Sequence, residues 1–511
     1  MTLGELVAAV GSLAPDALAR VEAAGRASEP VTGIVHDSRA VAKGAVFVAI
    51  PGQQVDGATF AAEAVRRGAA AVVAESAAPD DIGVPWLVAP SARRALADLA
   101  AAFHGHPSRS LSVVGVTGTN GKTTTTYLLT SVFDAAGVAA GRLGTVSFRV
   151  GPSAGEERIA SHTTPEADEI QQMLAEMLER GCRACVMEVS SHALALDRVA
   201  GMTFAAAIFT NLTRDHLDFH GDMQHYFAAK RRLFDMLADG APAIVNLDDP
   251  RGLELAGQLP RVIGFAIDRP ADVRPVQVDY SLEGVAFEAL TPRGRLTIRS
   301  PLIGRPNVSN ILGVIAAAEA LELPAAAIEQ GIAALERVPG RFELVSTSAD
   351  DIRVIVDYAH TDDALKNLLE TVRPLAPGRL VTIFGCGGDR DRSKRPLMGA
   401  VARRLSDFVF LTSDNPRSED PERILDEIVR GLDPTPEPGA PRRPGTPYLR
   451  IPDRREAIER AIRTAQPGDV LLIAGKGHEK YQVIGDRTLP FDDAEVARAA
   501  LADRRAASRV Q

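Results

Sequence analysis

The sequence predicts an α/β protein of three domains built on mainly parallel sheets. Short apolar runs alternate with helical patterns along most of the 511 residues, an order typical of parallel strands covered by helices. The chain is too long for one hydrophobic core, which indicates about three domains of ordinary size. Turn-forming stretches at "HPSRS" and "VPGR" separate these domains. We therefore expect domains at residues 1–108, 109–338 and 339–511.

The first two domains contain apolar runs that are expected to be strands. In the first, smaller α/β domain, a helical pattern at 91–105 follows four such runs, at 31–39, 44–50, 69–75 and 85–90. The middle domain has runs at 111–116, 182–190, 205–211 and 241–247. It continues with a patch of alternating residues from about 273 to 301 and ends with helical patterns at 307–322 and 325–336.

The last domain alternates strands and helices in the manner of a Rossmann-like fold. Its predicted strands are 353–359, 380–385, 407–413 and 469–475, with helical patterns between them. A stretch with six prolines, from Pro434 to Pro447, lies before the last of these strands. Such a composition favours a surface loop or a flexible excursion.

The composition argues against several classes of protein. The net charge of −9 disfavours a nucleic-acid-binding role, because that role needs clustered Lys and Arg. The first residues carry no basic leader, and no apolar run approaches the roughly 18 residues that span a bilayer. We expect a cytoplasmic monomer without membrane insertion. Cys182 and Cys185, in "GCRACVME", are interpreted as packing residues rather than a metal or redox pair.

The stretch "VVGVTGTNGKTTTT" predicts a phosphate-binding loop between a strand and a helix, in a P-loop-type central sheet. Glycines let backbone N–H groups surround phosphate oxygens, Lys122 supplies a positive charge, and Thr123 can bind Mg²⁺. The spacing is a variant, because Val116 stands five positions before Gly121, where the usual pattern has glycine. A glycine-rich turn without this role is the simpler alternative. GTPases, kinases and motor ATPases share such loops, so the loop alone names no reaction.

Acidic and histidine side chains follow two further predicted strands, at the sheet edge where α/β proteins bind ligands. Glu188 is placed to be an oxygen ligand for Mg²⁺ opposite Thr123. The second stretch, "TNLTRDHLDFHGDMQHYFAAKRR", contains Asp215, His216, Asp218, His220 and His225. A zinc site is the competing interpretation, but the spacing fits no usual zinc pattern and no cysteine is near. We interpret His220 and His225 as polar loop residues, and His216 as a candidate ligand.

These motifs resemble the Mur ligase family, ATP-dependent enzymes that make peptidoglycan precursors. The resemblance rests on "TGTNGKTT", "EVSSH", "TNLTRDHLDFHG" and the lysine of "YFAAKRRLF". It extends over nearly the whole chain through "HDSRAV", "RPNVSNILG", "VPGRFE", "DYAH", "GCGGDRDRSKRPLMG", "DNPR" and "AGKGHE". The most similar subgroup adds the third amino acid of the stem peptide.

The resemblance implies three sets of site residues. It assigns ATP to Gly118, Thr119, Asn120, Gly121, Lys122, Thr123, Thr124, Asn307, Arg341 and Asp357. It assigns Mg²⁺ to Thr123 and Glu188, and a second Mg²⁺ to His216 and Lys230 as a carbamate, so that Lys122, Glu188, His216 and Lys230 form the catalytic set. It assigns the substrate UDP-MurNAc-L-Ala-D-Glu to Ser38, Thr163, Thr164, Ser190 and Arg198. The chain departs from the family at Asp362, where proline is usual, and we expect this to alter only the start of a helix.

The implied reaction is an ADP-forming amide ligation. The carboxylate of D-Glu attacks the γ-phosphate of ATP to form an acyl phosphate, and an amine then displaces the phosphate. Catalysis would depend on positioning and charge stabilisation, since no Ser or Cys nucleophile motif is present. We expect the last domain to swing closed and exclude water from the acyl phosphate.

Arg417, in "TSDNPRSED", is the candidate determinant of the amine substrate. Asn415-Pro416 restricts the backbone before it, and a guanidinium pairs bidentately with a carboxylate. In the most similar subgroup, "DNPR" accompanies meso-diaminopimelate, whose distal end carries a carboxylate that L-lysine lacks. The resemblance assigns this substrate to Arg390, Asp414, Asn415, Pro416, Arg417, Gly475 and Glu479. The simpler alternative is a surface arginine that caps the helix beginning in "RSEDPERI".

Three other functions remain as alternatives. Within the family, the chain could add L-lysine, although lysine-adding relatives generally lack this arginine. Folylpolyglutamate synthetase shares the phosphate loop and the lysine region, but "DNPR" and "GCGGDRDRSKRP" argue against it. Outside the family, a P-loop ATPase or switch would hydrolyse ATP without ligating a product.

Overall fold

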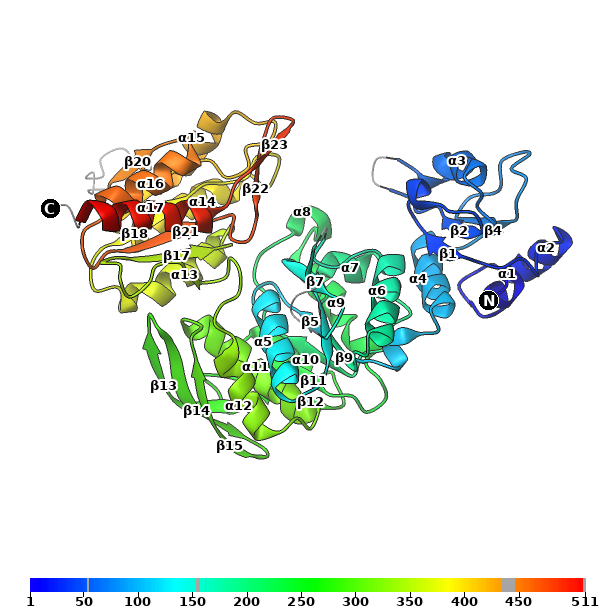
Figure 1. Ribbon diagram of the computed structural model, residues 1–511, viewed down its shortest axis with the longest axis horizontal. Coiled ribbons are helices and arrows are strands. Elements are labelled where there is room, and N and C mark those ends of the chain that lie inside the picture. The colour runs from blue at the N-terminus through cyan, green and yellow to red at the C-terminus, as the bar shows by residue number, and fades with distance from the viewer. Residues whose placement is uncertain (53–54, 153–156, 161, 434–445, 509–511) are drawn as a thin grey trace.

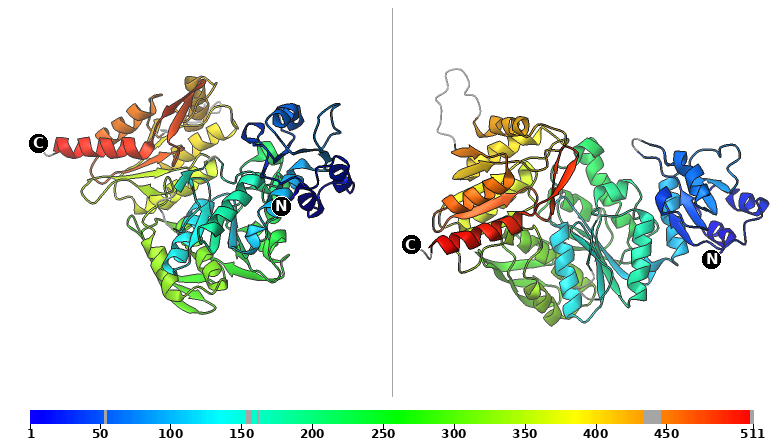
Figure 2. Two further views of the ribbon diagram at one scale, coloured as in Figure 1. Left: turned by 45° about the vertical axis from the view of Figure 1, so that its right-hand side comes forward. Right: turned by 45° about the horizontal axis from the view of Figure 1, so that its top comes forward.

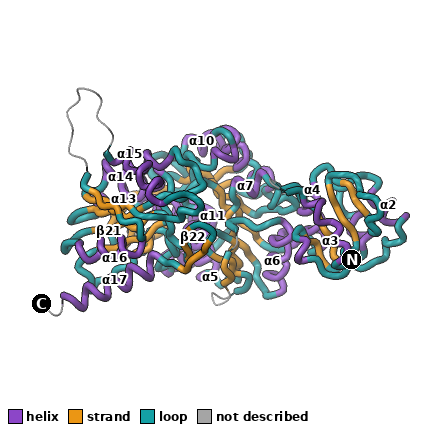
Figure 3. Tube along the Cα trace, turned by 90° about the horizontal axis from the view of Figure 1, so that it is seen from above, coloured by secondary structure: helices purple, strands orange, loops and turns teal. Residues whose placement is uncertain are grey.

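The protein is described by a computed structural model that covers residues 1–52, 55–152, 157–160, 162–433 and 446–508. Three bodies follow one another along the long axis, with the N-terminus at one end and α17 at the other (Figures 1 and 3). The same order is visible in both turned views (Figure 2). In the part of the chain that is described, no helix combines the length and apolarity needed to cross a membrane.

The N-terminal body is a four-stranded sheet in the order β1-β2-β3-β4 with parallel pairings throughout. Its strands are β1 (Gly33–Val35), β2 (Ala45–Val48), β3 (Ala71–Ala74) and β4 (Trp86–Val88). Its helices are α1 (Leu3–Ala8), α2 (Ala17–Ala23), α3 (Ala61–Arg66) and α4 (Ala92–Phe103). All four predicted strands and the predicted helix are confirmed. The pairing of His36 Nδ1 with Asp168, at 2.9 Å, joins this body to the next.

The central body is an eight-stranded sheet in the order β12-β11-β10-β5-β9-β6-β7-β8. Its strands are β5 (Ser112–Thr117), β6 (Ala140–Leu143), β7 (Ser147–Arg149), β8 (Glu157–Ile159), β9 (Ala184–Glu188), β10 (Ala206–Phe209), β11 (Ala243–Asn246) and β12 (Val262–Phe265). Its helices are α5 (Lys122–Ala135), α6 (Ala167–Glu179), α7 (Ser191–Ala195), α8 (Leu217–His220), α9 (Met223–Arg231) and α10 (Pro250–Ala256). Pairing is parallel from β12 to β6, so the carboxyl ends of β5, β9 and β10 share one edge.

A smaller antiparallel sheet packs beside the central one. It is formed by β13 (Arg274–Ser281), β14 (Gly284–Thr291) and β15 (Gly294–Ser300), which correspond to the predicted alternating patch. The predicted helices α11 (Arg305–Ala320) and α12 (Ala325–Ala334) follow. One apolar cluster joins Phe287 and Ile298 of this sheet to Ile328 and Leu128, so α11 and α12 share a core with the helix that follows the phosphate loop.

The C-terminal body is a six-stranded sheet in the order β16-β17-β21-β18-β19-β20, parallel except for β16. Its strands are β16 (Glu343–Leu344), β17 (Arg353–Asp357), β18 (Leu380–Phe384), β19 (Phe408–Leu411), β20 (Tyr448–Arg450) and β21 (Val470–Ala474). Its helices are α13 (Asp362–Val372), α14 (Lys394–Leu405), α15 (Pro421–Leu432), α16 (Arg454–Thr464) and α17 (Asp493–Ser508). A hairpin of β22 (Tyr481–Ile484) and β23 (Arg487–Pro490) lies between β21 and α17.

The predicted α/β class is confirmed, and all the strands expected in the last domain are present. Short strands such as β7, β20 and β22 were not predicted, because a polar residue interrupts each and leaves no continuous apolar run to recognise. The predicted boundaries near 108 and 338 fall between the sheets and stay a prediction. Most of the proline-rich stretch, residues 434–445, lies outside the described residues.

Helices α14 and α15 approach each other so closely that only glycine fits at two positions. A Cβ on Gly431 would lie 1.9 Å from the carbonyl oxygen of Pro396, and one on Gly399 would lie 2.2 Å from that of Ile428. Both neighbours are backbone atoms, which cannot rotate away. This contact holds together the helices that begin at two loops of the site described below.

We expect Gly431→Ala to lower the free energy of unfolding by about 1–3 kcal/mol, because the added methyl group forces the two helices apart. Gly257→Ala is the matched control, since a Cβ there meets nothing closer than 3.6 Å and its φ of −68° suits alanine. Urea unfolding of both variants measures the difference. Equal stability of the two would show that the helix pair tolerates the methyl group.

Candidate active site

The phosphate loop crosses from the end of β5 to the start of α5 in a conformation that favours glycine. Gly118 has φ +148° and Gly121 has φ +88°. A Cβ on Gly118 would lie 1.9 Å from Thr210 Oγ1, and one on Gly121 would lie 2.3 Å from Asn310 Oδ1. The loop is also held by the backbone N–H of Asn120, which donates to Asn211 Oδ1 at 2.9 Å. A loop of this shape ahead of a helix N-terminus fits a phosphate group.

Two lysines donate to the same carbonyl oxygen of this loop. Lys122 Nζ lies 2.9 Å from the oxygens of Gly118 and Thr119. Lys230 Nζ, from α9, lies 2.8 Å from the Gly118 oxygen and is almost completely buried. Burial and then the charge of Lys122 lower the pKa of Lys230 well below its usual value. Burial also lowers the pKa of Lys122, and Glu188 partly offsets this effect.

Glu188, at the end of β9, is buried beside the loop. Its Oε1 accepts from the backbone N–H of Thr145 at 2.8 Å, and its Oε2 accepts from Thr145 Oγ1 at 2.9 Å. Glu188, Thr123, Lys122 and His216 line one cavity of about 200 Å³. A carboxylate and a hydroxyl oxygen on one cavity suit Mg²⁺, which takes oxygen ligands and keeps water or phosphate as its others. Lys230 is not among the lining residues of this cavity; it lies behind Gly118.

His216 stands between the phosphate cavity and the C-terminal body. It has φ +53° and caps α8, and its side chain is 44% exposed. Its ring lies edge-on to that of His192, with centroids 4.8 Å apart. The interpretation of His220 and His225 as loop residues is wrong, because they lie in the short helices α8 and α9, which carry too little periodicity to be recognised. His220 Nε2 is 2.9 Å from Ser191 Oγ, and His225 pairs with Asp222. Over the described residues, no group of three or more His, Cys, Asp or Glu side chains is arranged to hold a metal ion.

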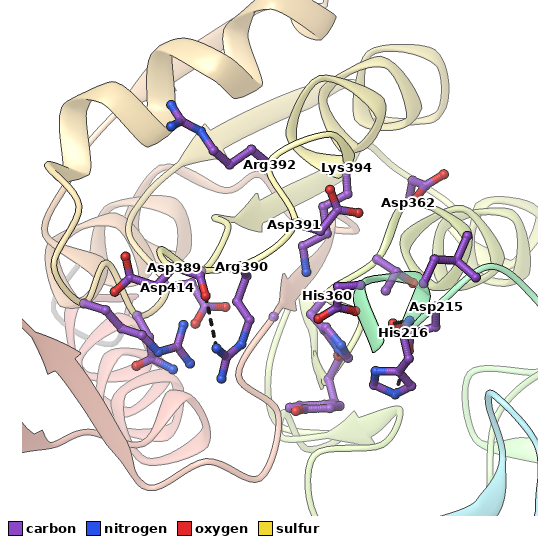
Figure 4. Close-up of a pocket in the computed structure, with 18 of the residues that line it drawn as sticks. Asp215, His216, His360, Asp362, Asp389, Arg390, Asp391, Arg392, Lys394 and Asp414 are labelled. Atoms are coloured by element: carbon purple, nitrogen blue, oxygen red, sulfur yellow. Dashed lines mark hydrogen bonds and ion pairs between the residues drawn. The ribbon is translucent and has the colours of Figure 1, made fainter. Parts of the chain in front are cut away.

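A larger cavity of about 880 Å³ lies between the central and C-terminal bodies. Figure 4 shows Asp215 and His216 on one side of it and Arg390 and Asp414 on the other. It shares a wall with the phosphate cavity, because both are lined by Asp215, His216, Tyr358, His360 and Thr361. The phosphate loop and Arg417, nearly three hundred residues apart in the chain, therefore line neighbouring cavities.

Arg417 is held in place by its backbone as well as by its side chain. It has φ +52°, its N–H donates to Val483 O, and its carbonyl oxygen accepts from Gly485 N–H, at 3.1 and 2.8 Å. Its Nη1 donates to Gly388 O at 2.7 Å. Arg417 also lines the larger cavity. The β22–β23 hairpin, which sequence reasoning missed, thus positions the predicted specificity residue.

Two other predicted amine-site residues, Asn415 and Glu479, belong to one hydrogen-bonded group. Asn415 Nδ2 donates to Glu479 Oε2 at 2.8 Å. Lys476, which was not predicted, is fully buried and donates to Asn415 Oδ1 at 3.0 Å and to Glu479 Oε2 at 2.9 Å. Gly475 has φ +119°, and a Cβ there would lie 2.6 Å from Asp414 Oδ2. The motif "AGKGHE" contains Lys476 directly after a predicted apolar strand, and this position could have suggested it.

The strand ends beneath this group are joined by a buried ion pair. Arg454 and Asp493 have fully buried side chains, with nitrogen–oxygen distances of 2.7 Å. Arg454 also donates to the carbonyl oxygens of Ser413 and Ala474, at 3.3 and 3.0 Å. These two residues follow β19 and end β21. The pair therefore ties together the two segments that carry Asp414 and Gly475.

Six of the predicted nucleotide residues line a third cavity of about 650 Å³: Asn120, Gly121, Thr124, Asn307, Arg341 and Asp357. Arg341 Nη2 donates to Thr123 Oγ1 at 3.4 Å across the two bodies, and its guanidinium lies 4.5 Å from the Tyr358 ring centroid. Asp357 accepts from the N–H groups of Phe342 and Ala359, each at 2.8 Å. Asn307 bonds to Ile303 O and to Asn310.

Four of the residues predicted for the UDP-sugar substrate lie together near Glu188. Thr164 Oγ1 donates to Glu188 O at 2.8 Å and accepts from Ser190 N–H at 3.1 Å. Arg198 Nη1 donates to Thr164 O at 2.9 Å. Thr163 and Ser190 line the phosphate cavity. Ser38 lies apart, in the N-terminal body, two residues after His36, which pairs with Asp168 of α6.

The expectation that Asp362 alters only the start of a helix is wrong in one respect. Asp362 does begin α13, after Thr361, whose side chain caps the helix by accepting from Ala364 N–H. Its carboxylate also accepts from Arg214 Nη2 at 3.1 Å. The departure therefore adds an ion pair between the central and C-terminal bodies, which a proline could not form.

Comparisons with known proteins agree with the resemblance seen in the sequence. Residues 30–104, 116–318 and 340–477 match "Mur ligase family, catalytic domain", "Mur ligase middle domain" and "Mur ligase, glutamate ligase domain". A UDP-N-acetylmuramoyl-L-alanyl-D-glutamate--2,6-diaminopimelate ligase of Solibacter usitatus is 47% identical over 508 residues, covering 98% of each chain. The protein of that name from Gloeobacter violaceus is 47% identical over 476 residues, covering 93% of this chain and 94% of its own.

Solved structures resemble the whole chain as well. A structure of a UDP-N-acetylmuramoyl-L-alanyl-D-glutamate--2,6-diaminopimelate ligase has a TM-score of 0.65 and 33% identity, covering 94% of this chain and 96% of its own. The MurF ligase of Thermotoga maritima, solved in complex with ADP, has a TM-score of 0.63 and 18% identity, covering 93% and 98%. The second likeness concerns the fold alone.

We expect Asp493→Asn to lower the free energy of unfolding by about 3–5 kcal/mol, because it leaves the Arg454 charge buried without its partner. Glu459→Gln is the matched control on α16. It removes an exposed ion pair with Arg455, whose atoms are 3.9 Å apart, and should cost about 0–1 kcal/mol. Thermal and urea unfolding measure both variants. A loss below about 1 kcal/mol for Asp493→Asn would contradict the structural role of this pair.

Proposed function

We propose the function of this chain from one premise: it belongs to the Mur ligase family. The three family matches together span most of the chain. A relative 47% identical over nearly the full length is a ligase of UDP-N-acetylmuramoyl-L-alanyl-D-glutamate and 2,6-diaminopimelate. The chain is an ADP-forming amide ligase of peptidoglycan precursor synthesis. It adds meso-diaminopimelate to the D-Glu carboxylate of UDP-MurNAc-L-Ala-D-Glu.

One structural observation carries the proposal: the phosphate cavity and the cavity of Arg417 share a wall. A ligase must bring an activated carboxyl and an amine together without water, whereas an ATPase or switch needs only the first cavity. The shared wall consists of Asp215, His216, Tyr358, His360 and Thr361, contributed by both bodies. The D-Glu carboxyl therefore reacts at this wall.

The reaction proceeds in two steps. In the first, the D-Glu carboxylate attacks the γ-phosphorus of ATP, the bond to the β,γ-bridging oxygen breaks, and ADP leaves. In the second, the amine attacks the acyl carbon, phosphate leaves with the former acyl oxygen, and the amine loses a proton. Lys122 and the loop amides hold the phosphates in line, and Arg341 reaches the phosphate side from the C-terminal body. Mg²⁺ held by Thr123 and Glu188 supplies charge neutralisation of the phosphates when it is bound.

The nucleoside and sugar sites follow from the remaining cavities. The cavity of about 650 Å³ lined by Asn307, Arg341 and Asp357 is the site for the nucleoside of ATP. Thr163, Thr164, Ser190 and Arg198 hold the peptide part of the UDP-linked substrate, because they lie between Glu188 and the N-terminal body. Ser38 contacts the same substrate from the N-terminal body.

The C-terminal pocket suits the distal end of meso-diaminopimelate better than that of L-lysine. Arg417 and Arg390 offer positive charge to a carboxylate, and Asp414 and Glu479 offer negative charge to the ammonium. Lys476 neutralises part of the acidic charge from behind. L-Lysine would leave Arg417 without a partner, and sites built on such a contact reject the analogue that lacks it by roughly 10⁴-fold. The lysine-adding ligase is the alternative, and Arg417 is the observation that disfavours it.

We expect the protein to release phosphate from ATP and UDP-MurNAc-L-Ala-D-Glu with meso-diaminopimelate roughly 10⁴-fold more efficiently than with L-lysine. Arg417→Ala should remove most of this preference by lowering kcat/KM for meso-diaminopimelate and leaving that for lysine nearly unchanged. Phosphate release with mass spectrometry of the ligated product measures both. Arg423→Ala is the control, since Arg423 lies on the exposed part of α15.

Three results would contradict this assignment. Faster ligation of L-lysine would favour the lysine-adding alternative. Equal losses on both amino acids in Arg417→Ala would remove Arg417 from selectivity. ATP hydrolysis that is independent of any amine, without a ligated product, would favour an ATPase or switch.

Lys230 is proposed to act as a carbamate, and its surroundings support this chemistry. Burial and the charge of Lys122 lower the pKa of Lys230 and so favour its uncharged amine, the form that attacks CO₂ to give a carbamate and release one proton. The product is an anionic oxygen group beside the loop, next to Lys122. It would join His216 in holding a second Mg²⁺. An unmodified ammonium at this place would repel both Lys122 and a metal ion.

We expect Lys230→Met to lower kcat by about 10²-fold or more, because the anionic group that orients the charges of the site is lost. Carbon-13 NMR with labelled bicarbonate should show a carbamate signal in the natural protein and none in Lys230→Met. The exposed Lys366→Met variant on α13 is the control and should keep both signal and activity. Full activity without a carbamate signal in the natural protein would refute the modification.

A further inference from the structure

Arg395, the second residue of α14, is a fully buried arginine that lies outside the amine cavity. Its Nη1 donates to Glu419 Oε2 at 2.9 Å and to Glu427 Oε2 at 2.8 Å. Its Nη2 donates to Glu419 Oε1 at 2.8 Å and to Gly387 O at 3.1 Å. One guanidinium thus connects α15 with the two loops at 387–391 and 415–419.

The two loops joined by Arg395 are also joined directly to each other. Glu419 Oε1 accepts from Asp389 N–H at 2.7 Å, and Asp389 accepts from the N–H and Oγ of Ser418, at 3.1 and 2.8 Å. Gly388 N–H donates to Asn415 O at 2.9 Å. A Cβ on Gly388 would lie 1.9 Å from Pro416 O. The loops therefore behave as one unit.

This unit presents both arginines of the proposed amine pocket. Arg390 lies on the first loop, where its Nη1 donates to Asp389 O at 3.0 Å. Arg417 lies on the second loop and donates to Gly388 O of the first. Figure 4 shows Arg390 directed into the pocket and Arg392, which pairs with Glu427, directed away from it. A shift of either loop would move the two guanidinium groups relative to each other.

We infer that Arg395 is a positioning residue for the amine substrate: its guanidinium fork fixes the spacing of Arg390 and Arg417 and keeps Glu419 from pairing with them. The inference rests on the proposed function and names a further residue for its selectivity. Arg395 touches no substrate and acts through Glu419 and Gly387.

Arg395 also prevents Glu419 from competing with the substrate carboxylate, and this second effect follows from the position of Glu419. Glu419 lines the same cavity as Arg390 and Arg417. Its carboxylate is an anion of the same kind as the substrate carboxylate. The hydrogen bonds from Arg395 lower the pKa of Glu419 to about 2, so it stays ionised. Without Arg395, this carboxylate would be free to bind Arg417 and compete with the substrate.

Lysine cannot replace the guanidinium here. The four contacts of Arg395 leave from two nitrogens of one plane toward two carboxylates and a carbonyl. An ammonium is a single point donor on a flexible stem and reaches only part of this set. Arg395→Lys therefore keeps the positive charge and loses the planar arrangement of two donor nitrogens.

The test is the full kinetics of Arg395→Lys with each of the three substrates varied in turn. We expect KM for meso-diaminopimelate to rise at least about tenfold, because a displacement near 1 Å at a binding group is costly. KM for ATP and for UDP-MurNAc-L-Ala-D-Glu should stay within about twofold, and the preference over L-lysine should fall. Arg379→Lys is the matched control. This variant alters another bidentate pair, that of Arg379 with Asp469. The two residues directly precede β18 and β21, so they lie at the strand ends opposite the pocket.

The KM values for the three substrates distinguish a positioning role of Arg395 from a general loss of stability. A diaminopimelate KM within about twofold of the natural value, or an equal rise in all three KM values, would overturn it. If Arg395→Lys does not fold, as judged by thermal unfolding, Glu419→Gln decides, because it keeps the shape and removes one of the two carboxylates that hold the guanidinium. A selective rise in the KM for meso-diaminopimelate is expected, smaller than in Arg395→Lys because a neutral amide does not compete with the substrate carboxylate. If the natural protein ligates a different amino acid, the proposed function fails, and the KM of that amino acid decides the role of Arg395.

Discussion

The carbonyl oxygen of Gly118 is the point on which the charge balance of the site depends. It accepts hydrogen bonds from Lys122 at 2.9 Å and from Lys230 at 2.8 Å. Two ammonium groups this close repel each other, and burial removes the water that would screen them. The site is therefore built to receive negative charge. Phosphates bound at the loop, and the proposed carbamate of Lys230, would both relieve this repulsion.

Buried ion pairs hold the pocket segments of the C-terminal body in place. Its proposed amine pocket brings Arg390, Arg417, Asp414 and Glu479 to the ends of parallel strands, where loops are more mobile than the strands themselves. Behind them, the pairs of Arg454, Lys476 and Arg395 hold these segments. Such pairs add little net stability compared with apolar packing, but removing one partner is costly. The value of these pairs lies in the fixed geometry of the pocket.

The central and C-terminal bodies are joined by polar contacts at the site and by an apolar contact beside it, where Ile303 packs with Leu365 and Leu368. Arg341 reaches Thr123 at 3.4 Å, and Arg214 pairs with the exposed side of Asp362 at 3.1 Å. Exposed ion pairs contribute little to stability, so these polar contacts alone oppose a change in the separation of the two bodies only weakly. Closure of the last body over the substrates remains a prediction, and weak contacts of this kind suit it. Such a movement would change the distance between Asp215 and His216 of the central body and Tyr358, His360 and Thr361 of the C-terminal body, which together form the shared wall.

The sequence alone determined the α/β class, the long strands, the phosphate loop and the identity of most polar residues near it. These features depend on local patterns: apolar periodicity, glycine spacing and acidic residues at strand ends. Tertiary structure decided what local patterns do not contain. The hairpin that fixes Arg417, the buried Lys476, the Arg454–Asp493 pair and the Arg395 fork each join residues distant in the chain. The pairing of Asp362 with Arg214 was missed for the same reason, because a charge at a helix start has no visible partner until the chain folds.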